Sequence, residues 1–398
     1  MEKEGHIMIL SRQLSYLRTV LGIIHGSRAF GGPFQILLSL TNRCNIRCVH
    51  CIFHSPLLER PNLGPLRKAR FMSLPFPKDE ELKRIQSLEI DPKRTSALID
   101  EVVRMGTRRF QFSGSGEPFL HRNALEFMGR AKHSGCTCVV NTNGTLLSRE
   151  VMDELLGMRF DELQITTMAG SPKVYCQTHL GSKNDDFDKI EANLLYLAER
   201  KKALALHQPK VTLCNVVISP NHNGLMEFAR FASNVDAERV LFRAFFNVKD
   251  ESLSSMVPGP EETSIIFDQM AQVKLYLDSV GIEHNVNNFL CVFRGKLDTS
   301  DLYLKIPCYY GWLSTRIEVD GEVYPCCRCH VPLGNIQQSD FNDIWHAESY
   351  ASFRRKASRI NKLADPIAGC ACDQCANFNA NLSVYEFLHP VKRRSLVV

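Results

Sequence analysis

The chain has 398 residues, 44% hydrophobic and 23% charged, which is the composition of a globular protein with a large domain and a smaller one. Its net charge of +5 is spread along the chain, which argues against a nucleic-acid-binding surface, and no apolar run reaches the length of a membrane span. Fifteen cysteines without a secretory signal indicate metal ligands in a reducing cytoplasm rather than a disulfide framework.

The first predicted element is an amphipathic helix within residues 1–33. Its apolar residues recur at helical spacing, at Leu10, Leu14, Leu17, Leu21 and Ile24. Such a stripe predicts a helix that packs on the domain behind it. A helix that lies at a membrane interface is the alternative that the same pattern leaves open.

A strand-like run at residues 34–40 leads into three cysteines on one loop. Cys44, Cys48 and Cys51 have the spacing C-x3-C-x2-C. Thiolates this close can converge on one soft metal centre, and three of them leave a coordination position open for chemistry. The spacing favours an iron–sulfur cluster, and a zinc site completed by His50 or His54 is the alternative.

Residues 53–91 contain many prolines and charges, and we expect an irregular loop there that acts as a lid or a partner surface. From residue 95 onward, helices and strands alternate. Strands are predicted at 109–112, 137–141, 162–167, 211–218 and 239–246, and helices at 96–105, 123–133, 149–158, 187–203 and 225–232.

This alternation implies parallel βαβ units, whose functional loops meet at the carboxyl ends of the strands. The cysteine loop, the turn at residues 113–118 and the turn at residues 142–144 all follow strands. We therefore expect these three segments to lie together. Arg243, near the end of the last strand, is a candidate for gripping a substrate, and His54 and His179 are weaker acid–base candidates.

The rest of the chain contains a second group of cysteines. A helical linker at residues 251–298 precedes a cysteine-rich module at residues 299–387, and a basic tail occupies residues 388–398. Within the module, residues 317–324 predict a hairpin that turns at Asp320 and Gly321, and residues 341–349 predict a helix. The cysteine pairs of this module are also compatible with a zinc ribbon.

These motifs resemble the radical S-adenosylmethionine (SAM) superfamily over residues 34–250. The loop matches the family's C-x3-C-x-Φ-C motif, with His50 where an aromatic residue is usual. The resemblance implies an α/β fold, a partial (β/α)6 TIM-type barrel, with a [4Fe–4S] cluster on Cys44, Cys48 and Cys51. It also implies a set of SAM contacts, with Glu117 near the SAM amino group, comprising His50, Gly114, Gly116, Glu117, Pro118, Asn141 and Asn143.

The C-terminal module resembles the twitch form of the SPASM extension, as found in aminocyclitol dehydrogenases. The opening C-x9-15-G-x4-C matches Cys308, Gly321 and Cys326, and the closing C-x2-C matches Cys372 and Cys375. The resemblance implies that these four cysteines hold an auxiliary [4Fe–4S] cluster. The surplus residues Cys327, Cys329 and Cys370 are alternative ligands.

The resemblance implies that the enzyme cleaves SAM reductively and abstracts hydrogen from a substrate through a 5′-deoxyadenosyl radical. The electron would come from a flavodoxin or ferredoxin. We expect oxidation or remodelling of a hydroxylated small molecule, such as an amino sugar, cyclitol or nucleoside sugar. A peptide-modifying maturase and a non-catalytic iron–sulfur or zinc protein are the alternatives.

Overall fold

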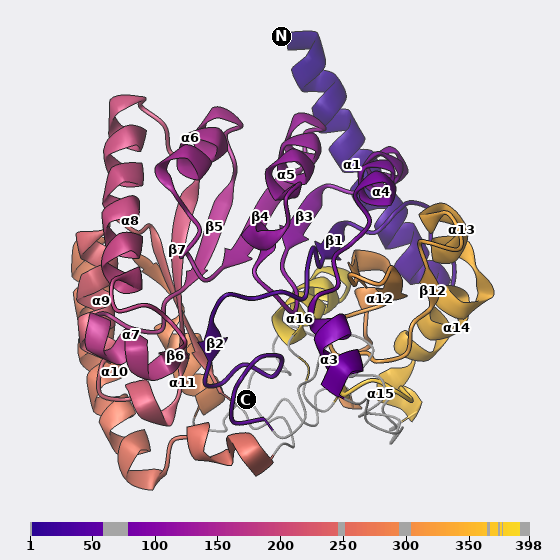
Figure 1. Ribbon diagram of the computed structural model, residues 1–398. Helices are drawn as coiled ribbons and strands as arrows, with labels where there is room; N and C mark the ends of the chain where they lie inside the picture. Colours follow the sequence, from indigo (N-terminus) through magenta and orange to yellow (C-terminus); the bar gives the residue numbers. More distant parts are fainter. Residues whose placement is uncertain are drawn as a thin grey trace.

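The computed structural model describes residues 2–58, 79–245, 251–293, 304–363, 367–372, 375 and 377–390. Within these ranges one mainly parallel sheet runs through the molecule in the order β12-β11-β10-β1-β3-β4-β5-β7-β8-β9, with helices covering its outer face (Figure 1). Among the described residues the two edge strands, β12 and β9, do not pair with each other. The predicted α/β fold is confirmed.

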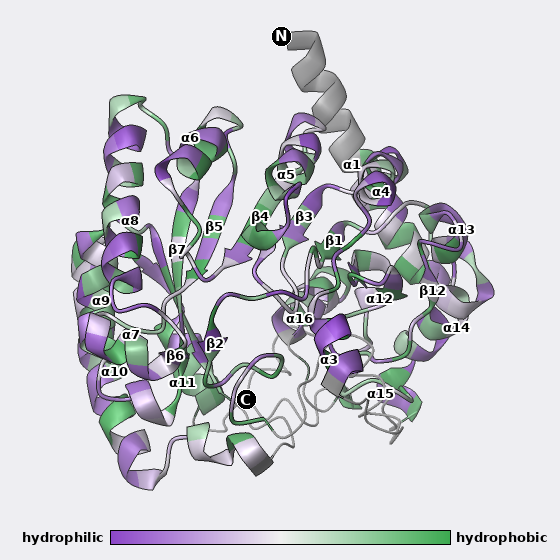
Figure 2. Cartoon of the chain, in the orientation of Figure 1, coloured by the Kyte–Doolittle hydropathy of each residue, from purple (hydrophilic) through white to green (hydrophobic). Residues whose placement is uncertain are grey.

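The central strands and their helices follow the predicted alternation. The parallel strands are β1 (Gln35–Leu38), β3 (Arg109–Phe112), β4 (Thr137–Thr142), β5 (Glu162–Thr166), β7 (Lys210–Val217) and β8 (Arg239–Ala244). The helices between them are α4 (Pro92–Met105), α5 (Ala124–His133), α6 (Arg149–Gly157), α8 (Asp186–Ala203) and α9 (Leu225–Asn234). In Figure 2, α6 and α8 alternate hydrophilic and hydrophobic residues, as helices that cover a sheet should.

Helix boundaries follow local capping chemistry. The α4 helix begins earlier than predicted because Asp91 caps it, accepting a hydrogen bond from the Arg94 backbone N at 2.7 Å, and Pro92 fits the first turn. Its predicted stop at Gly106 is confirmed, since that residue has a φ of 108°, which a glycine adopts without strain.

The two faces of the sheet differ in polarity. In β1 and β3 the fully buried side chains alternate with half-buried ones, as the two-residue period of a strand requires. On the polar face, Gln35 Nε2 donates to Gln111 Oε1 at 3.3 Å, and Gln111 Nε2 donates to Asn141 Oδ1 at 3.0 Å. Further along, Glu162 accepts hydrogen bonds from Thr212 and Arg239. A polar ladder therefore crosses this face of the sheet.

The C-terminal region joins the same sheet. Strand β10 (Ser314–Ile317) pairs in parallel with β1, and β11 (Glu322–Tyr324) and β12 (Gly334–Asn335) continue outward in antiparallel pairing. The predicted hairpin is confirmed, with Gly321 at a φ of 82°. The helices of this region are α12 (Tyr310–Leu313), α13 (Phe341–His346), α14 (Glu348–Ala357), α15 (Ile360–Leu363) and α16 (Phe378–Leu388). The pairing of β10 with β1 was not predicted from the sequence.

Several short elements also differ from the sequence predictions. Part of the stretch at residues 53–91 is the helix α3 (Asp79–Gln86), and residues 59–78 lie outside the described residues. The helix α7 (Pro172–Thr178) and the strand β6 (His179–Leu180) were not predicted; β6 pairs with β2 (Arg47–Cys48). The predicted helical linker contains α10 (Pro260–Val280), β9 (Glu283–His284) and α11 (Val286–Phe293). The basic tail at residues 391–398 is not among the described residues.

The predicted N-terminal helix is α1 (Glu2–His25), and it packs on the domain, but not through its apolar stripe. Its small residues face the protein: Ser15 Oγ donates to the Gly106 backbone O at 2.9 Å, and a Cβ on Gly22 would lie 2.7 Å from the Trp312 ring. The apolar stripe instead faces solvent. The close approach of the small residues decides which side of the helix meets the domain. No helix in the described ranges is long and apolar enough to cross a membrane.

Candidate functional site

The three-cysteine loop follows β1 and is held by a short antiparallel pair. Cys48 of β2 lies opposite His179 of β6, and the Val49 backbone N donates to the Thr178 backbone O at 3.0 Å. Within the loop, the Cys51 backbone N donates to the Cys48 backbone O at 3.0 Å. The loop is therefore fixed on two sides, by β1 before it and by β6 across from it.

The three thiols share one desolvated environment. Burial raises the pKa of Cys44 to about 11 and raises the pKa values of Cys48 and Cys51 above the usual thiol range. The neighbouring Cys51 and Cys44 raise the Cys48 pKa further, so the three sulfurs lie near one another. Such thiols suit a metal centre, because coordination removes their protons.

The cysteine geometry can be compared with what each kind of metal centre needs. Among the described residues, no three His, Cys, Asp or Glu side chains are close enough to share a single metal ion. A [4Fe–4S] cluster does not require that closeness, since each thiolate binds a different iron.

The glycine-rich turn after β3 lies against the backbone of the cysteine loop. A Cβ on Gly116 would overlap the Arg43 carbonyl O and approach the Thr41 carbonyl O to 2.6 Å. The Glu117 backbone N donates to the same Arg43 carbonyl O at 2.8 Å. A Cβ on Gly114 would lie 2.5 Å from Ser39 Oγ. Glycine is needed at both positions because the two backbones touch there.

Glu117 connects this turn to the end of β4. Its side chain, with the residue 2% exposed, accepts hydrogen bonds from Thr142 Oγ1 at 2.7 Å, the Asn143 backbone N at 2.7 Å and the Phe119 backbone N at 3.3 Å. Burial raises the pKa of Glu117 to about 7, against the lowering effect of these hydrogen bonds. The carboxyl group therefore fastens two of the three predicted turns together.

Asn143 extends the network to the third turn. Its Nδ2 donates to Asn45 Oδ1 at 2.9 Å, and its Oδ1 accepts from the Thr145 backbone N at 2.9 Å. Asn45 Nδ2 in turn donates to Thr145 Oγ1 at 2.8 Å. The Asn143 side chain also hydrogen-bonds Cys44, which favours the thiolate. The expected meeting of the three turns is confirmed.

Sequence reasoning missed two members of this network, Asn45 and Thr145. Both stand next to residues that were singled out, Asn45 within the cysteine motif and Thr145 directly after the Asn143–Gly144 turn. Short polar residues at such positions were the available signal. Asn141 lies apart from the network, on the polar face of the sheet beside Gln111.

Burial lowers the pKa values of three histidines in this region. Burial lowers the pKa of His50 to about 3, and its ring meets Phe245 edge-on with centroids 6.2 Å apart. His50 Nδ1 has no hydrogen-bond partner among the described residues. Burial also lowers the pKa of His179 to about 4 and that of His54. These rings are neutral near pH 7. Arg243 is exposed on β8.

A pocket in the C-terminal domain is lined by cysteines. The four predicted ligands, Cys308, Cys326, Cys372 and Cys375, all line it. Asn381 Nδ2 lies 3.9 Å from Cys308 Sγ. Burial raises the pKa of Cys308 to about 12, and the nearby Cys375 and Cys372 contribute. The pocket therefore brings together the four cysteines whose spacing the sequence analysis singled out.

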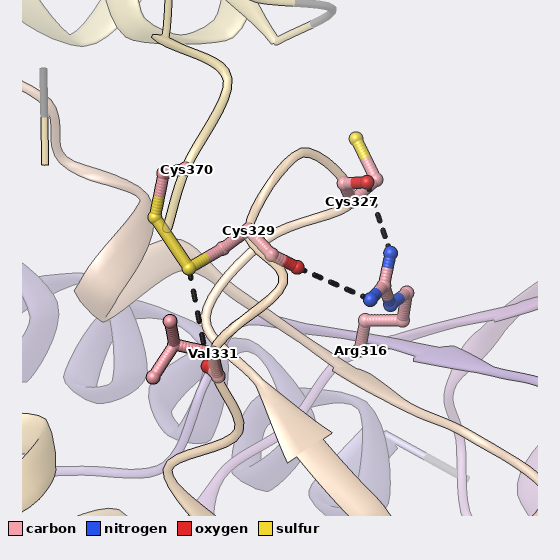
Figure 3. Close-up of a disulfide and its surroundings, with 5 residues drawn as sticks. All are labelled: Arg316, Cys327, Cys329, Val331 and Cys370. Atoms are coloured by element: carbon pink, nitrogen blue, oxygen red, sulfur yellow. Dashed lines mark hydrogen bonds between the residues drawn. A yellow bond between two sulfur atoms is a disulfide. The ribbon is translucent and has the colours of Figure 1, made fainter. Parts of the chain in front are cut away.

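Two of the surplus cysteines, Cys329 and Cys370, form a disulfide at the edge of this pocket (Figure 3). The two segments are paired beside it, since the His330 backbone N donates to the Gly369 backbone O at 2.8 Å and Ala371 N donates to Arg328 O at 2.8 Å. The sequence analysis expected metal ligands rather than a disulfide framework, and these two alternative ligands pair with each other instead. The backbone bridge brings the two residues directly opposite each other.

The loop that carries Cys327 and Cys329 is also held by a buried cation. Arg316 Nη1 donates to the Cys327 backbone O at 2.9 Å, and its Nη2 donates to the Cys329 backbone O at 3.3 Å (Figure 3). The Cys327 side chain points away from the disulfide, and Asn377 Nδ2 lies 3.4 Å from its sulfur.

Comparison with known proteins gives two family matches. Residues 38–231 match the radical SAM superfamily, and residues 308–376 match the SPASM iron–sulfur cluster-binding domain. Among curated proteins, the chain is 24% identical to a tungsten-containing aldehyde ferredoxin oxidoreductase cofactor-modifying protein of Pyrococcus furiosus, over 80% of this chain and 82% of that protein. It is 23% identical to the PqqA peptide cyclase of Xanthomonas campestris pv. campestris, over 82% of this chain and 77% of the relative.

Solved structures share the fold. Streptococcus suis SuiB bound to its precursor peptide SuiA is 12% identical, with a TM-score of 0.58, over 85% of this chain and 70% of SuiB. The anSMEcpe protein, with AdoMet and a Kp18Cys peptide bound, is 17% identical, with a TM-score of 0.53, over 88% of each chain. The cofactors of this architecture are [4Fe–4S] clusters and SAM. The chain belongs to the radical SAM superfamily and is a radical SAM enzyme with a C-terminal SPASM-type, twitch-like auxiliary-cluster domain.

Proposed function

We propose that this radical SAM enzyme modifies a peptide. The observation that carries its chemistry is the convergence of the three-thiol loop with the Glu117 and Asn143 turns at the carboxyl ends of β1, β3 and β4. The peptide substrate is supported by the relatives, which include a PqqA peptide cyclase and a SuiB structure with its precursor peptide. The expected hydroxylated small molecule becomes the second candidate, supported by a 25% identical GTP 3′,8-cyclase over 69% of this chain.

In this proposal Cys44, Cys48 and Cys51 hold the SAM-binding cluster. Their mutual proximity and burial fit a cluster that takes three thiolates and leaves one iron free for SAM. When bound and reduced, the cluster and SAM supply the 5′-deoxyadenosyl radical that abstracts hydrogen from the substrate. We expect a flavodoxin or ferredoxin to supply the electron.

The chain's own residues hold the site in place. Glu117 fixes the β3 and β4 turns against each other, and Asn143 orients Cys44 through its side chain. Gly114 and Gly116 let the first turn lie against the cysteine loop. His50, neutral and half-buried, packs edge-on against Phe245 beside the loop. The site is thereby preorganised for SAM.

We assign the auxiliary cluster to Cys308, Cys326, Cys372 and Cys375. All four line one pocket, and their thiols raise one another's pKa values. Cys329 and Cys370 are excluded from this assignment because they pair with each other. Cys327 is the remaining alternative, since it raises the Cys375 pKa and lies close to it.

The polar face of the sheet is suited to a peptide. The amides of Gln35, Gln111 and Asn141 form a chain of hydrogen bonds across it, and Gln164 Oε1 is buried there without a partner among the described residues. Side-chain amides offer both donors and acceptors to a peptide backbone. Arg243, exposed on β8, is available for an acidic side chain of the substrate.

The test is isotope transfer. The enzyme is reconstituted with iron and sulfide under anaerobic conditions, reduced with dithionite, and given SAM with deuterated candidate peptides or deuterated cyclitols and sugars. Deuterium in 5′-deoxyadenosine from a peptide supports the proposal. Deuterium from a sugar or cyclitol alone would reinstate the small-molecule substrate. Absence of any 5′-deoxyadenosine would point to a non-catalytic iron–sulfur protein.

A further inference from the structure

The N-terminal helix α1 exposes a continuous apolar stripe. Leu14, Leu17, Leu21 and Ile24 are 47%, 54%, 45% and 71% exposed. They recur at steps of three and four residues, so they lie on one side of the helix. A stripe of this kind on a globular surface marks a contact with another molecule.

The stripe is not needed to hold α1 on the domain. The attachment uses the other side of the helix, where Ser15 hydrogen-bonds to Gly106, and Gly22 lies against Trp312 and the Arg28 carbonyl. Residues 15 and 22 stand roughly 100–150° around the helix from the stripe, as the 3.6-residue turn requires. The helix lies at the outside of the molecule (Figure 1), and the exposure of the four stripe residues leaves them open to a partner.

The spacing of the stripe indicates that the partner is another helix. The apolar positions continue toward the N-terminus in the sequence, giving a 3-4-3-4-3 pattern at Ile7, Leu10, Leu14, Leu17, Leu21 and Ile24. This is the a and d pattern of a heptad repeat, which forms when two helices pack side by side. A membrane-surface helix would instead be rich in basic residues, whereas α1 has three basic and two acidic residues, Lys3, Arg12, Arg18, Glu2 and Glu4.

The flanking positions are compatible with a second copy of the same helix. With Leu14 and Leu21 at a, the e positions include Arg18 and His25, and the g positions include Gln13 and Val20. In a parallel pair, each g residue faces the following e residue of the other helix, so Gln13 faces Arg18 and Val20 faces His25. No two like charges face each other.

We propose that α1 is a dimerisation helix that pairs in parallel with α1 of a second copy of this chain. A free helix pair of this length would be marginal, because ordering a short helix costs conformational entropy. Here the contacts of Ser15 and Gly22 already hold the helix on the domain, which lowers that cost. The dimer is independent of the substrate and of the cluster chemistry.

The test uses the full chain, purified anaerobically, in sedimentation equilibrium over a dilution series. The variant Leu17→Glu/Leu21→Glu places two carboxylates in the apolar stripe, at the proposed contact between the two helices (the seam). Its matched control is Leu195→Glu, a leucine of similar exposure, 42%, on the helix α8. Thermal unfolding of all three proteins confirms that the exposed substitutions leave the fold intact.

We expect the wild type and Leu195→Glu to form dimers, and the double variant to dimerise at least roughly 100-fold more weakly, because the seam buries unpaired charge. Equal dimerisation of all three proteins would overturn the assignment of the seam. A wild type that stays monomeric would overturn the proposal. If that monomer floats with phosphatidylcholine or phosphatidylserine vesicles and the double variant does not, the stripe binds lipid instead.

Discussion

Glu117 also has a structural role that its position in the sequence does not indicate. The family resemblance implies a place near the SAM amino group, and the structure adds three hydrogen bonds, two of which join the turn after β3 to the end of β4. Burial makes this carboxyl group expensive to ionise in spite of these contacts, and raises its pKa to about 7. Its charge and its positioning contacts can be separated experimentally.

Replacement of Glu117 by Gln is expected to destabilise the protein by about 1–3 kcal/mol at low pH, because an amide NH2 in place of Oε1 cannot accept the hydrogen bond that the Phe119 backbone N donates. The wild-type pKa is raised from 4.5 to about 7, so the folded state holds a proton that the unfolded state has released between these values. Wild-type stability therefore falls as pH rises through this window, and the variant lacks that fall. The difference in the free energy of unfolding between wild type and Glu117→Gln should therefore narrow from pH 4.5 to pH 7.

Urea unfolding of both proteins across this range measures the gap. Thr107→Val is a matched control, since it removes a buried, non-titrating hydrogen bond, from Thr107 Oγ1 to the Pro33 backbone O at 2.8 Å, outside the Glu117 network. A gap between wild type and Glu117→Gln that stays constant or widens with pH would contradict the assignment of the raised pKa to Glu117.

The contact between the turn after β3 and the cysteine loop can be tested at Gly116. Gly116→Ala forces a Cβ against the carbonyl groups of Arg43 and Thr41, so we expect about 1–3 kcal/mol of destabilisation and weaker SAM binding. Gly157→Ala in α6 is the control, because no atom lies within 4 Å of its Cβ position. Calorimetric SAM titration and thermal unfolding measure both effects. Normal SAM affinity in Gly116→Ala would show that the turn can move away from the loop.

At the scale of elements, the α/β alternation was predictable because its signals are local. The buried strand β7 is a short apolar run, and α4 has a clear stop at Gly106. The pair β2–β6, two residues long on each side, has no such signal, although it fixes the loop that carries Cys48. The outward face of α1 was also unpredictable, because periodicity locates an apolar stripe but not the direction it faces.

The disulfide gives a prediction about the auxiliary cluster. If Cys329 and Cys370 act as a pair rather than as ligands, Cys329→Ala, Cys370→Ala and the double variant should have the same small effect on iron content. Cys372→Ala, a change at a proposed ligand in the same pocket, should lose about four irons per chain. Iron and sulfide analysis after reconstitution measures both. A loss of about four irons in either single variant would make that cysteine a ligand.

At the scale of the whole molecule, the C-terminal domain is continuous with the core. Strand β10 extends the sheet beside β1, which leads directly into the three-cysteine loop. The sequence identified both cysteine groups and their spacing, and the structure confirms that each group gathers in one place. The sequence could not show that the two are linked through one sheet, because strand pairing between residues nearly 300 positions apart leaves no local pattern.

If the protein holds two separate clusters, its iron content has a specific expected value. The reconstituted wild type should contain about eight irons, and a triple Cys44→Ala/Cys48→Ala/Cys51→Ala variant about four, because each [4Fe–4S] centre holds four. The charge-transfer absorption should fall in proportion. About four irons in the wild type would contradict the assignment of the C-terminal pocket.

The most direct test of the central claim is formation of 5′-deoxyadenosine by the reduced, reconstituted enzyme, compared between wild type, Cys48→Ala and Cys372→Ala. We expect the wild type to form it, Cys48→Ala to form none, and Cys372→Ala to retain SAM cleavage. The absence of 5′-deoxyadenosine in the wild type, or equal amounts in wild type and Cys48→Ala, would contradict the assignment of the three-cysteine loop as the SAM-cleaving centre.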